Sequence, residues 1–441
     1  MRKISLIAPV FYLLVVFAFV STVSAAHCRV TTAEDRVDQS CDLADCSLRE
    51  AIVEPSCSTI DFSLDVAGTP IVLSLGEFVI QRNLTITGWG ADAITISGNH
   101  TSRIFYVSSG ATLNLKGMTL RDGNGMGTLP ADGGAIRSIG PVNLDSVYLT
   151  GNQAPGKGAA ISYQGGASSS KTIRNSTFAE NWGASDGRAA VYVSGTVNVY
   201  NSSLYNNGAS IYVESSFLIM VNTTIGPGLS IQAIGMAQIL YSNSVAPNLY
   251  RQGTMVNFHS NGNNIASTMP NGGSIAYAAS DLVGADPALG PPQYYGGHMP
   301  ILPLLPGSPA IDGGNDDRAS AASLITDQRG FDRFGIGVSG RPIVDIGAFE
   351  FNAVAQPPVT VAGRVLGAVS GNPLRSQIVT ITDMLGNTRT ALSSSLGWFV
   401  FDDLPAGFVY RVSVKARRGT ITRTVFGDQD LSDTDVTIPG W

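Results

Sequence analysis

Seven carboxylates lie between residues 84 and 264, and they are the groups of this stretch best suited to acid–base chemistry. A polysaccharide lyase needs carboxylates to hold calcium and an arginine or lysine to remove a proton, and a glycoside hydrolase needs two carboxylates across the scissile bond. Asp122 and Asp132, with Arg121 or Arg137, form the best such set, in a glycine-rich stretch. The other acids are scattered, which favours turn and surface roles: Asp92, Asp145, Glu180, Asp186 and Glu214.

The same stretch carries a repeat. Seven segments share an apolar residue, any residue and a small or amide residue, and a further apolar residue follows three positions later. Their third positions are 29, 29, 29, 26, 21 and 20 residues apart. Such periods, with short alternating β-branched runs, indicate a solenoid whose units stack to bury their apolar faces. We therefore predict a right-handed parallel β-helix over residues 83–351. The segments are Ile86-Thr87-Gly88, Leu115-Lys116-Gly117, Leu144-Asp145-Ser146, Ile173-Arg174-Asn175, Val199-Tyr200-Asn201, Met220-Val221-Asn222 and Leu240-Tyr241-Ser242.

Strand alternation places the first residue of each segment inside the coil and the second outside. The outward residues then form a ladder: Lys116, Asp145, Arg174, Tyr200, Val221 and Tyr241. A second strand-like series gives another: Arg137, Ser162, Tyr192, Tyr212 and Gln232. Opposite charges and aromatic pairs account for both ladders structurally. The tyrosines could also stack on sugar rings, so the candidate binding residues are Tyr192, Tyr212, Tyr200 and Tyr241.

An amide column occupies the third position of several segments. Asn175, Asn201 and Asn222 share it with Ser146 and Ser242. Asparagine tolerates left-handed backbone geometry and can bond to the matching group of the next coil, so the column predicts a stacked turn. The three asparagines also begin glycosylation sequons, but the turn explains all of them and we predict no glycans.

The N-terminus resembles a secretory signal over residues 1–26. Arg2 and Lys3 precede an apolar run, and small residues follow it. An uncleaved membrane anchor is the alternative. Lipid attachment at Cys28 is excluded, because His27 stands where a small residue is needed.

All four cysteines fall near the predicted mature start, and an even number in an exported chain indicates two disulfides. Three pairings are possible, and we favour Cys41–Cys46 nested inside Cys28–Cys57. A zinc site is the weaker alternative because paired CxxC units are missing.

The residues Cys46-Ser47-Leu48-Arg49-Glu50-Ala51 closely resemble the CSLREA motif of exported bacterial β-helix proteins. The apolar residues Leu48, Ala51 and Ile52 have helical spacing, so a short helix is expected to cover the first coil of a cap over residues 27–82. Such a cap protects an open solenoid end from edge-to-edge association. We expect Arg49 and Glu50 to be solvated.

Two further resemblances concern residues 83–351. Gly133-Gly134-Ala135-Ile136 and Phe178-Ala179-Glu180-Asn181 resemble repeats of polymorphic outer-membrane proteins, which are pectin-lyase-like surface adhesins. Leu305-Pro306-Gly307-Ser308-Pro309-Ala310-Ile311-Asp312 and Ile346-Gly347-Ala348-Phe349-Glu350 resemble a choice-of-anchor Q region. Carboxylates of this region could bind calcium, although turn capping and arginine pairing are favoured. The groups concerned are Asp312, Asp316, Asp317, Asp327 and Glu350, with Arg318, Arg329 and Arg341.

Residues 352–358 read as a linker, and residues 359–441 contain short alternating strands punctuated by Gly and Pro, which predicts a β-sandwich. The stretch from Gly397 to Gly407 closely resembles a carboxypeptidase-regulatory-like (transthyretin-like) domain, a non-catalytic accessory module in that family.

Composition narrows the functional classes. The 441 residues include 50 glycines and only 14% charged residues, with a formal net charge of −6 and no basic stripe, so we predict no nucleic-acid partner. The expected protein is a secreted or cell-surface bacterial scaffold or adhesin that binds a glycan or surface protein, without a membrane span in its mature form. The alternative is a lyase or hydrolase of acidic polysaccharides that uses Asp122, Asp132 and Arg137.

Overall fold

The computed structural model describes residues 26–38, 41, 45–165, 171–183, 189–266, 275–334, 343–351, 353, 359–383, 388–404, 408–416, 419–427 and 434–438. The predicted signal and linker lie outside these ranges, except for Ala26 and Ala353.

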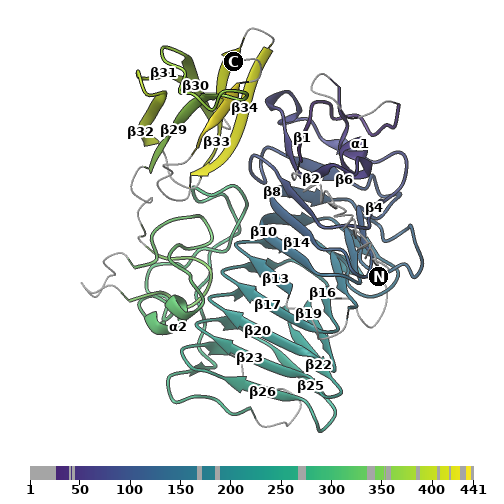
Figure 1. Cartoon of the computed structure of the whole chain (residues 1–441). Helices are drawn as coiled ribbons and strands as arrows, with labels where there is room; N and C mark the ends of the chain where they lie inside the picture. The colour runs from purple at the N-terminus through teal and green to yellow at the C-terminus, as the bar shows by residue number, and fades with distance from the viewer. Residues whose placement is uncertain are drawn as a thin grey trace, which may run out of the picture.

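The chain winds into a parallel β-helix whose strands stack in three columns (Figure 1), followed by a β-sandwich, so the predicted fold class is confirmed. The first column contains β1 (Ala26–Val30), β2 (Cys57–Phe62), β5 (Leu84–Thr87), β8 (Leu113–Arg121), β10 (Val142–Thr150), β13 (Lys171–Arg174), β17 (Thr196–Tyr200), β20 (Phe217–Val221), β23 (Gln238–Ser242) and β26 (Asn257–Ser260). The second shares β8 and β10 and adds β3 (Ile71–Val72), β6 (Thr95–Ser97), β14 (Thr177–Ala179), β18 (Ser203–Tyr205), β21 (Thr224–Ile225), β24 (Val245–Ala246), β27 (Ile265–Ala266) and β28 (Leu282–Val283). The third contains β4 (Phe78–Ile80), β7 (Phe105–Val107), β9 (Ile136–Ser138), β12 (Ile161–Tyr163), β16 (Ala189–Val193), β19 (Ala209–Glu214), β22 (Ile231–Ile234) and β25 (Leu249–Gln252). A short separate pair is formed by β11 (Gln153–Ala154) and β15 (Trp182–Gly183).

The inside of the first column is aliphatic and in register. Leu115, Leu144, Ile173, Val199 and Met220 pair successively along the column, and all are almost completely buried. Because each coil can hide these side chains only against its neighbours, the register of the backbone and the burial of the core are one constraint.

The predicted register is wrong by one residue at the last segment. Tyr241 pairs with Met220 and Ser242 with Val221, so Tyr241 points into the core and is fully buried. A slip of one residue moves a strand's side chains to the opposite face, and the larger apolar surface of Tyr241 is the one buried. Asn243, rather than Ser242, takes the third position.

The amide column is a left-handed turn, as predicted. Ser146, Asn175, Asn201, Asn222 and Asn243 have φ values of 56°, 51°, 51°, 49° and 48°. Their side chains also join the coils: the Asn201 amide donates to Asn175 Oδ1 at 2.7 Å, and that of Asn243 to Asn222 Oδ1 at 3.2 Å. A second, interior ladder of Asn152, Asn181 and Asn207 bonds in the same way at 3.0 Å.

The N-terminal cap covers the first coil. Helix α1 (Leu48–Val53) begins with a capping box between Ser47 and Glu50, and the short 3-10 helix η1 (Leu64–Val66) follows β2. The expectation that Arg49 and Glu50 are solvated is wrong. The Glu50 side chain is buried, and its carboxylate accepts a hydrogen bond from the Ser47 backbone N–H at 2.7 Å. The Arg49 guanidinium donates to the Asp35 carboxylate at 2.6 Å.

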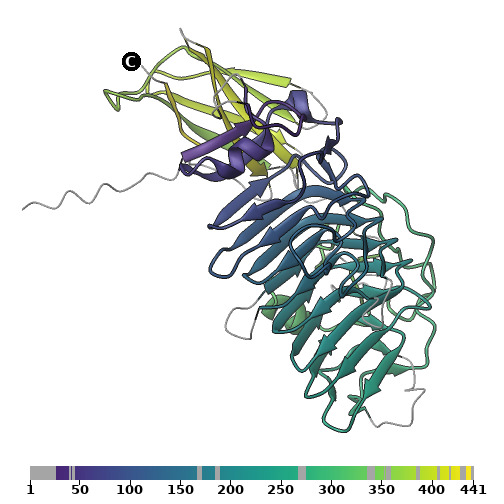
Figure 2. The ribbon, with the colours of Figure 1, turned by 90° about the vertical axis from the view of Figure 1, so that its right-hand side faces the viewer.

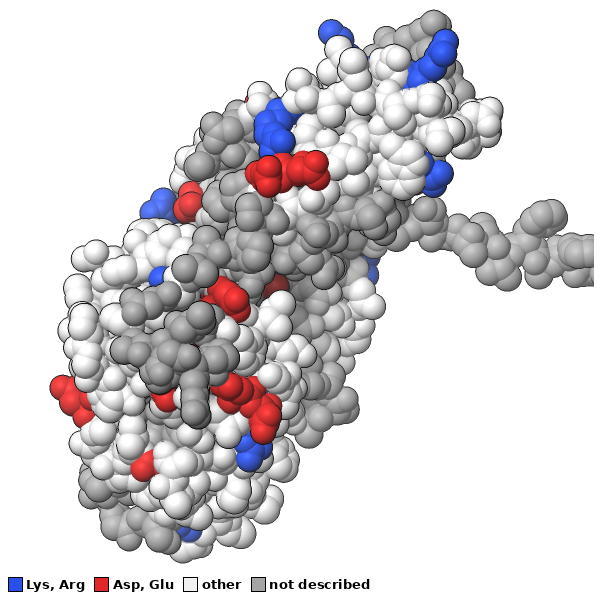
Figure 3. All heavy atoms as spheres, turned by 90° about the vertical axis from the view of Figure 1, so that its left-hand side faces the viewer, with Lys and Arg blue, Asp and Glu red and all other residues white. Residues whose placement is uncertain are grey.

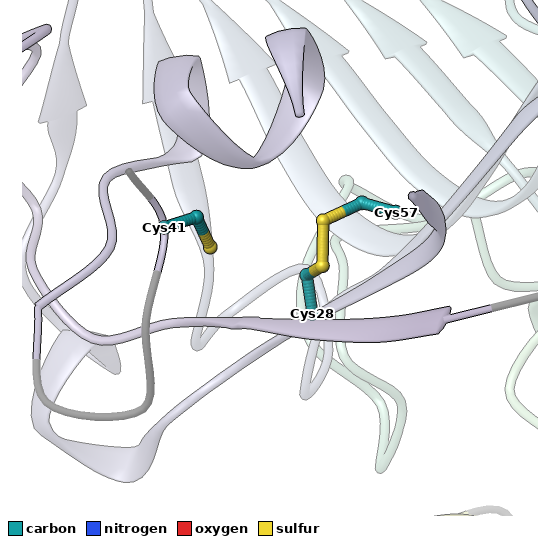
Figure 4. A group of neighbouring side chains, drawn as sticks. All are labelled: Cys28, Cys41 and Cys57. Atoms are coloured by element: carbon teal, nitrogen blue, oxygen red, sulfur yellow. A yellow bond between two sulfur atoms is a disulfide. The ribbon is translucent and has the colours of Figure 1, made fainter. Parts of the chain in front are cut away.

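Two disulfides, Cys28–Cys57 and Cys41–Cys46, give the pairing that the sequence favoured. The sulfurs of Cys28, Cys41 and Cys57 lie within 4.8 Å of one another, with Cys41 facing the first bond (Figure 4). Because disulfide sulfurs are not thiolates, this cluster cannot bind zinc in its oxidised form.

Residues 285–334 and 343–351, hereafter the covering segment, pack over the first and second columns and include helix α2 (Asp316–Ala321) (Figure 1). The amide column holds this segment. Asn201 donates to the Thr326 carbonyl at 3.1 Å, Asn222 to that of Asp345 at 3.0 Å and Asn243 to that of Asn315 at 2.9 Å.

The sandwich packs beside the cap (Figures 1 and 2). One sheet contains β29 (Val359–Gly367), β32 (Trp398–Leu404) and β35 (Val436–Ile438), and the other contains β30 (Ile378–Asp383), β31 (Thr388–Leu392), β33 (Phe408–Ala416) and β34 (Gly419–Gly427). The Arg411 guanidinium lies 5.9 Å from the Trp89 ring centroid, and a cavity of about 370 Å³ separates His27 from β34 and β35.

We expect Asn222→Ala to lower the free energy of unfolding by about 2–3 kcal/mol, because it strips buried carbonyls and the Asn243 amide of their partners. Urea denaturation would measure this. Asn257→Ala, at an exposed asparagine whose amide donates to Gln238 Oε1 at 3.2 Å, should change stability by less than about 0.5 kcal/mol. Equal effects of the two substitutions would contradict a docking role for the column.

Candidate functional site

The outward side chains of the third column form one row, on the side of the β-helix opposite the covering segment (Figures 1 and 2). Backbone pairing places one residue from each of seven consecutive strands in register, which confirms the second predicted ladder and extends it at both ends. With strands about 4.8 Å apart, the row is roughly 30 Å long. Its members are Tyr106, Arg137, Ser162, Tyr192, Tyr212, Gln232 and Tyr250.

A charged cluster lies over the middle of the row. Lys157, from the segment between β11 and β12, donates to Glu214 Oε2 at 2.6 Å and to the Tyr192 hydroxyl at 3.1 Å. The Tyr192 hydroxyl itself donates to Glu214, and the Lys157 ammonium lies 4.6 Å from the Tyr192 ring centroid. The three groups therefore form a closed network rather than three independent side chains.

Asp132 and Arg137 lie beside this cluster and are connected through Gln164. Asp132 Oδ1 accepts the Lys157 backbone N–H at 2.7 Å, and Oδ2 accepts the Gln164 amide at 2.5 Å. The Gln164 Oε1 accepts Arg137 Nη2 at 3.1 Å, and the guanidinium lies 5.3 Å from the Tyr106 ring centroid. Arg137 is 8% exposed, and its buried Nε has no hydrogen-bond partner within the described part of the chain.

A fully buried arginine holds the long loop between β8 and β9 against this site. Arg103 pairs with Glu77 at 2.6 Å, and Glu77 also binds the Thr128 N–H at 2.5 Å. The remaining guanidinium hydrogens of Arg103 fix the loop by donating to the carbonyls of Gly125, Thr128, Pro130, Asp132 and Gly133. The glycine-rich loop between β8 and β9 is therefore folded into a fixed wall that positions Asp132.

The electrostatics of the cluster disfavour proton transfer near neutral pH. Burial acts to lower the pKa of Lys157, but its bonds to Glu214 and Tyr192 outweigh this and raise it. Burial and the Glu214 carboxylate raise the pKa of Tyr192, and the bonds from Lys157 and Tyr192 lower that of Glu214. These directions keep Lys157 protonated, Tyr192 neutral and Glu214 ionised near neutral pH.

The tyrosines do not offer open ring faces along the whole row. Tyr192 and Tyr212 stack on each other with centroids 6.0 Å apart and planes at 20°, and Lys157 lies over Tyr192. Tyr192 is therefore 5% exposed, whereas Tyr212 is half-buried. The Tyr192 ring is covered by Tyr212 and Lys157, so this pair does not offer the open face-on stacking that the sequence suggested.

The other candidate residues lie elsewhere. Asp122 contacts Ser97 at 3.2 Å and His100 at 3.6 Å at the edge of the second column, and the candidate cation Arg121 lies 3.4 Å from its carboxylate. Tyr200 is in the first column under the covering segment, with Arg174 5.2 Å from its ring centroid, and Tyr241 is in the core. Tyr241 is fully buried and is therefore wrong as a binding residue, whereas Tyr200 is half-buried against the covering segment and its role in binding stays a prediction.

Sequence reasoning missed Lys157, Gln164 and Tyr250, and treated Glu214 as a scattered acid. Lys157 and Gln164 flank β12 and Glu214 ends β19, so none stands in the row itself. Lys157 and Glu214 are 57 residues apart in the sequence. They meet because they lie only two coils apart in the stacked β-helix. The available signal was the short spacing of Tyr212 and Glu214 along one strand.

Three of the carboxylates considered for calcium, those of Asp316, Asp327 and Glu350, are engaged by arginines or backbone N–H groups. Asp327 pairs with Arg329 at 2.6 Å, and Glu350 pairs with Arg333 at 3.0 Å; Arg341 lies outside the described residues. Burial raises the pKa of Asp345 to about 6, against the hydrogen bonds that it accepts from Phe351 and Asp312. Burial also raises the pKa of Glu350. These groups stabilise turns of the covering segment.

No family model matches the chain, and a search of curated proteins gives no significant match. The family resemblances noted in the sequence therefore stay predictions. Within the described ranges, no helix has the length and apolar character needed to cross a membrane.

We expect the covering segment to dock less stably as pH rises from about 4 to about 6. The Asp345 carboxyl ionises near pH 4 in the unfolded chain but near 6 when buried, so the unfolded state binds fewer protons across this interval. The loss is at most about 3 kcal/mol for a two-unit shift. Hydrogen exchange of residues 343–351, corrected for intrinsic rates, would measure it. Asp345→Asn should flatten the pH dependence, and an unchanged slope in that variant would assign the effect to another group.

Proposed function

We propose that this chain is a non-catalytic extracellular scaffold or adhesin that binds a glycan across the outer face of the third column. The single observation that carries the proposal is the network of Lys157, Tyr192 and Glu214 within a polar and aromatic row. Sugar hydroxyl groups both donate and accept hydrogen bonds, and the row and its neighbours present both kinds of partner. Arg137, Gln164 and Gln232 supply amide and guanidinium donors, while carboxylate and amide oxygens accept.

The direction of the pKa shifts supports binding over turnover. A low pKa at Glu214 makes a poor general acid, and a high pKa at Lys157 makes a poor general base. The enzymatic alternative, a polysaccharide lyase or glycoside hydrolase, would use Asp132 and Glu214, since both contact Lys157. Asp122 is not part of this network, because its contacts are to Ser97, His100 and Arg121.

The setting proposed for this function is the bacterial cell exterior. Residues 1–26 carry the features of a signal, and the two disulfides suit an oxidising compartment. On the motif resemblances, residues 27–82 are a CSLREA-type cap, residues 83–351 end in a choice-of-anchor Q-like region, and residues 359–441 are a carboxypeptidase-regulatory-like module.

A glycan array probed with the mature chain, followed by calorimetry on the best ligand, tests the proposal. Arg137→Gln and Tyr212→Ala should each weaken binding roughly ten-fold to hundred-fold, the effect of losing about 1.5–3 kcal/mol of hydrogen bonding to a charged or half-buried group. Lys116→Gln, which removes a cation from the first column, is the matched control and should bind normally.

Product analysis separates the alternatives. Binding without release of reducing or unsaturated sugars is expected. Release that Glu214→Gln abolishes would replace the scaffold with an enzyme. If no glycan binds but a surface protein does, and Arg137→Gln abolishes that binding, the third column remains the binding surface and the partner is a protein.

A further inference from the structure

The two disulfides of the cap lie side by side. The sulfur of Cys41 is within 4.8 Å of both sulfurs of the Cys28–Cys57 bond and faces that bond (Figure 4). Cys41 is itself bonded to Cys46. A disulfide has an S–S length of about 2 Å, so the Cys41 sulfur would have to move by at most about 3 Å to bond to Cys28 or Cys57. The two disulfides are therefore close enough to exchange partners.

Other contacts hold the two strands that the Cys28–Cys57 bond joins. Strands β1 and β2 pair through their backbones, and Arg29 of β1 donates to the Asp61 carboxylate of β2 at 2.8 and 2.7 Å. The start of β2 is fixed independently, because Arg82 donates to the Cys57 carbonyl. Cys28 and Cys57 can therefore stay in place when the bond between them breaks.

The Cys46 backbone is anchored to the end of β1. Its N–H donates to Thr31 Oγ1 at 2.9 Å, and its carbonyl accepts the Thr31 N–H at 2.9 Å. Cys46 and Cys57 are fully buried, whereas Cys41 is half-buried. Cys41 is thus the more exposed half of its own disulfide, and a thiol from solvent can attack the Cys41–Cys46 bond there.

We propose that Cys41 is a thiol relay that couples the two disulfides of the cap into one redox-sensitive unit. An external dithiol attacks Cys41 Sγ and displaces Cys46 as a thiolate. The second thiol of the reductant then closes its own disulfide and releases Cys41, so the dithiol is oxidised by two electrons and the Cys41–Cys46 bond is reduced.

The second step is exchange within the cap and is redox-neutral. The Cys41 thiolate attacks one sulfur of the Cys28–Cys57 bond, a new S–S bond forms at Cys41, and the other sulfur leaves as a thiolate that takes up a proton. After this step no disulfide joins β1 to β2. A reduction that begins at Cys41 thereby loosens the first strand of the β-helix, which is then held by its backbone pairing and by the contact between Arg29 and Asp61.

The variant Cys46→Ser tests the relay in the mature full-length chain, because it leaves Cys41 without its native partner. Thiols are alkylated in acidic denaturant, where protonation of the thiolates stops exchange, and the disulfides are mapped by peptide mass spectrometry without reduction. We expect Cys41 to lose label and Cys28 or Cys57 to gain it, with a new bond between Cys41 and the other cysteine.

The matched control is Cys41→Ser, which leaves Cys46 unpaired instead. Cys46 does not belong to the group of three clustered sulfurs found among the described residues. The label should therefore stay on Cys46, and the Cys28–Cys57 bond should stay intact.

The wild-type chain supplies a second measurement if circular dichroism shows that either variant fails to fold. The chain has a net charge of −6, and acidic groups are exposed on the face shown in Figure 3, so the probe is uncharged dithiothreitol rather than an anionic thiol. At limiting dithiothreitol, the species with two thiols should include molecules in which Cys41 is bonded to Cys28 or Cys57.

Four results would overturn the relay. They are label confined to Cys41 in Cys46→Ser, equal exchange in the control variant, a two-thiol wild-type species with native bonds alone, and a dimer linked through Cys41. None of the clustered cysteines belongs to the row of the third column, so glycan binding should be the same in every variant. Failure of the relay would therefore leave the glycan proposal to its own test.

Discussion

In-register stacking of the coils is the constraint on which the rest of the molecule depends. A single coil has no interior of its own, so its aliphatic residues, its strand edges and its turn asparagines are all satisfied by the coils above and below. The left-handed turns at Asn175, Asn201 and Asn222 are affordable because each side chain bonds to a neighbouring coil or to the covering segment, which offsets the backbone strain. Register, turn geometry and core burial therefore fix one another.

The covering segment uses that regularity as a docking surface. Equally spaced amides meet the backbone carbonyls of Thr326, Asp345 and Asn315, so a segment of irregular structure is held by a regular column. Buried ions complete the contact: the Arg333 guanidinium binds Glu350 and Asn201 together. Two columns are thereby committed to packing, which is why the proposed glycan site is on the third column.

Much of the β-helix could be predicted from the sequence, because alternation along a strand shows which residues face the core and which face outwards. The repeat located the first and third columns and the turn column, and placed Tyr192 over Tyr212. It failed where two neighbouring residues were both plausible core residues: Leu240 and Tyr241 differ by one position, and only packing decides between them. It also failed for side chains beyond the strands, such as Lys157, since loop geometry is set by contacts with other coils. The buried role of Arg103 had no local signal.

A row that repeats with the coils favours an extended ligand over a compact one. Each coil adds one outward side chain directly above that of the coil before it. Equivalent side chains therefore recur along the long axis of the β-helix. A linear polymer can use several of them at once, and each weak contact then gains from the others because the chain is already localised. In the proposed function Tyr192 is covered by Lys157, so such a ligand would form hydrogen bonds mainly with the half-buried Tyr212, Gln232 and Tyr250, and less with the nearly buried Arg137. Its affinity would then rise with its length. If the third column binds a glycan as proposed, a polysaccharide therefore suits it better than a small sugar.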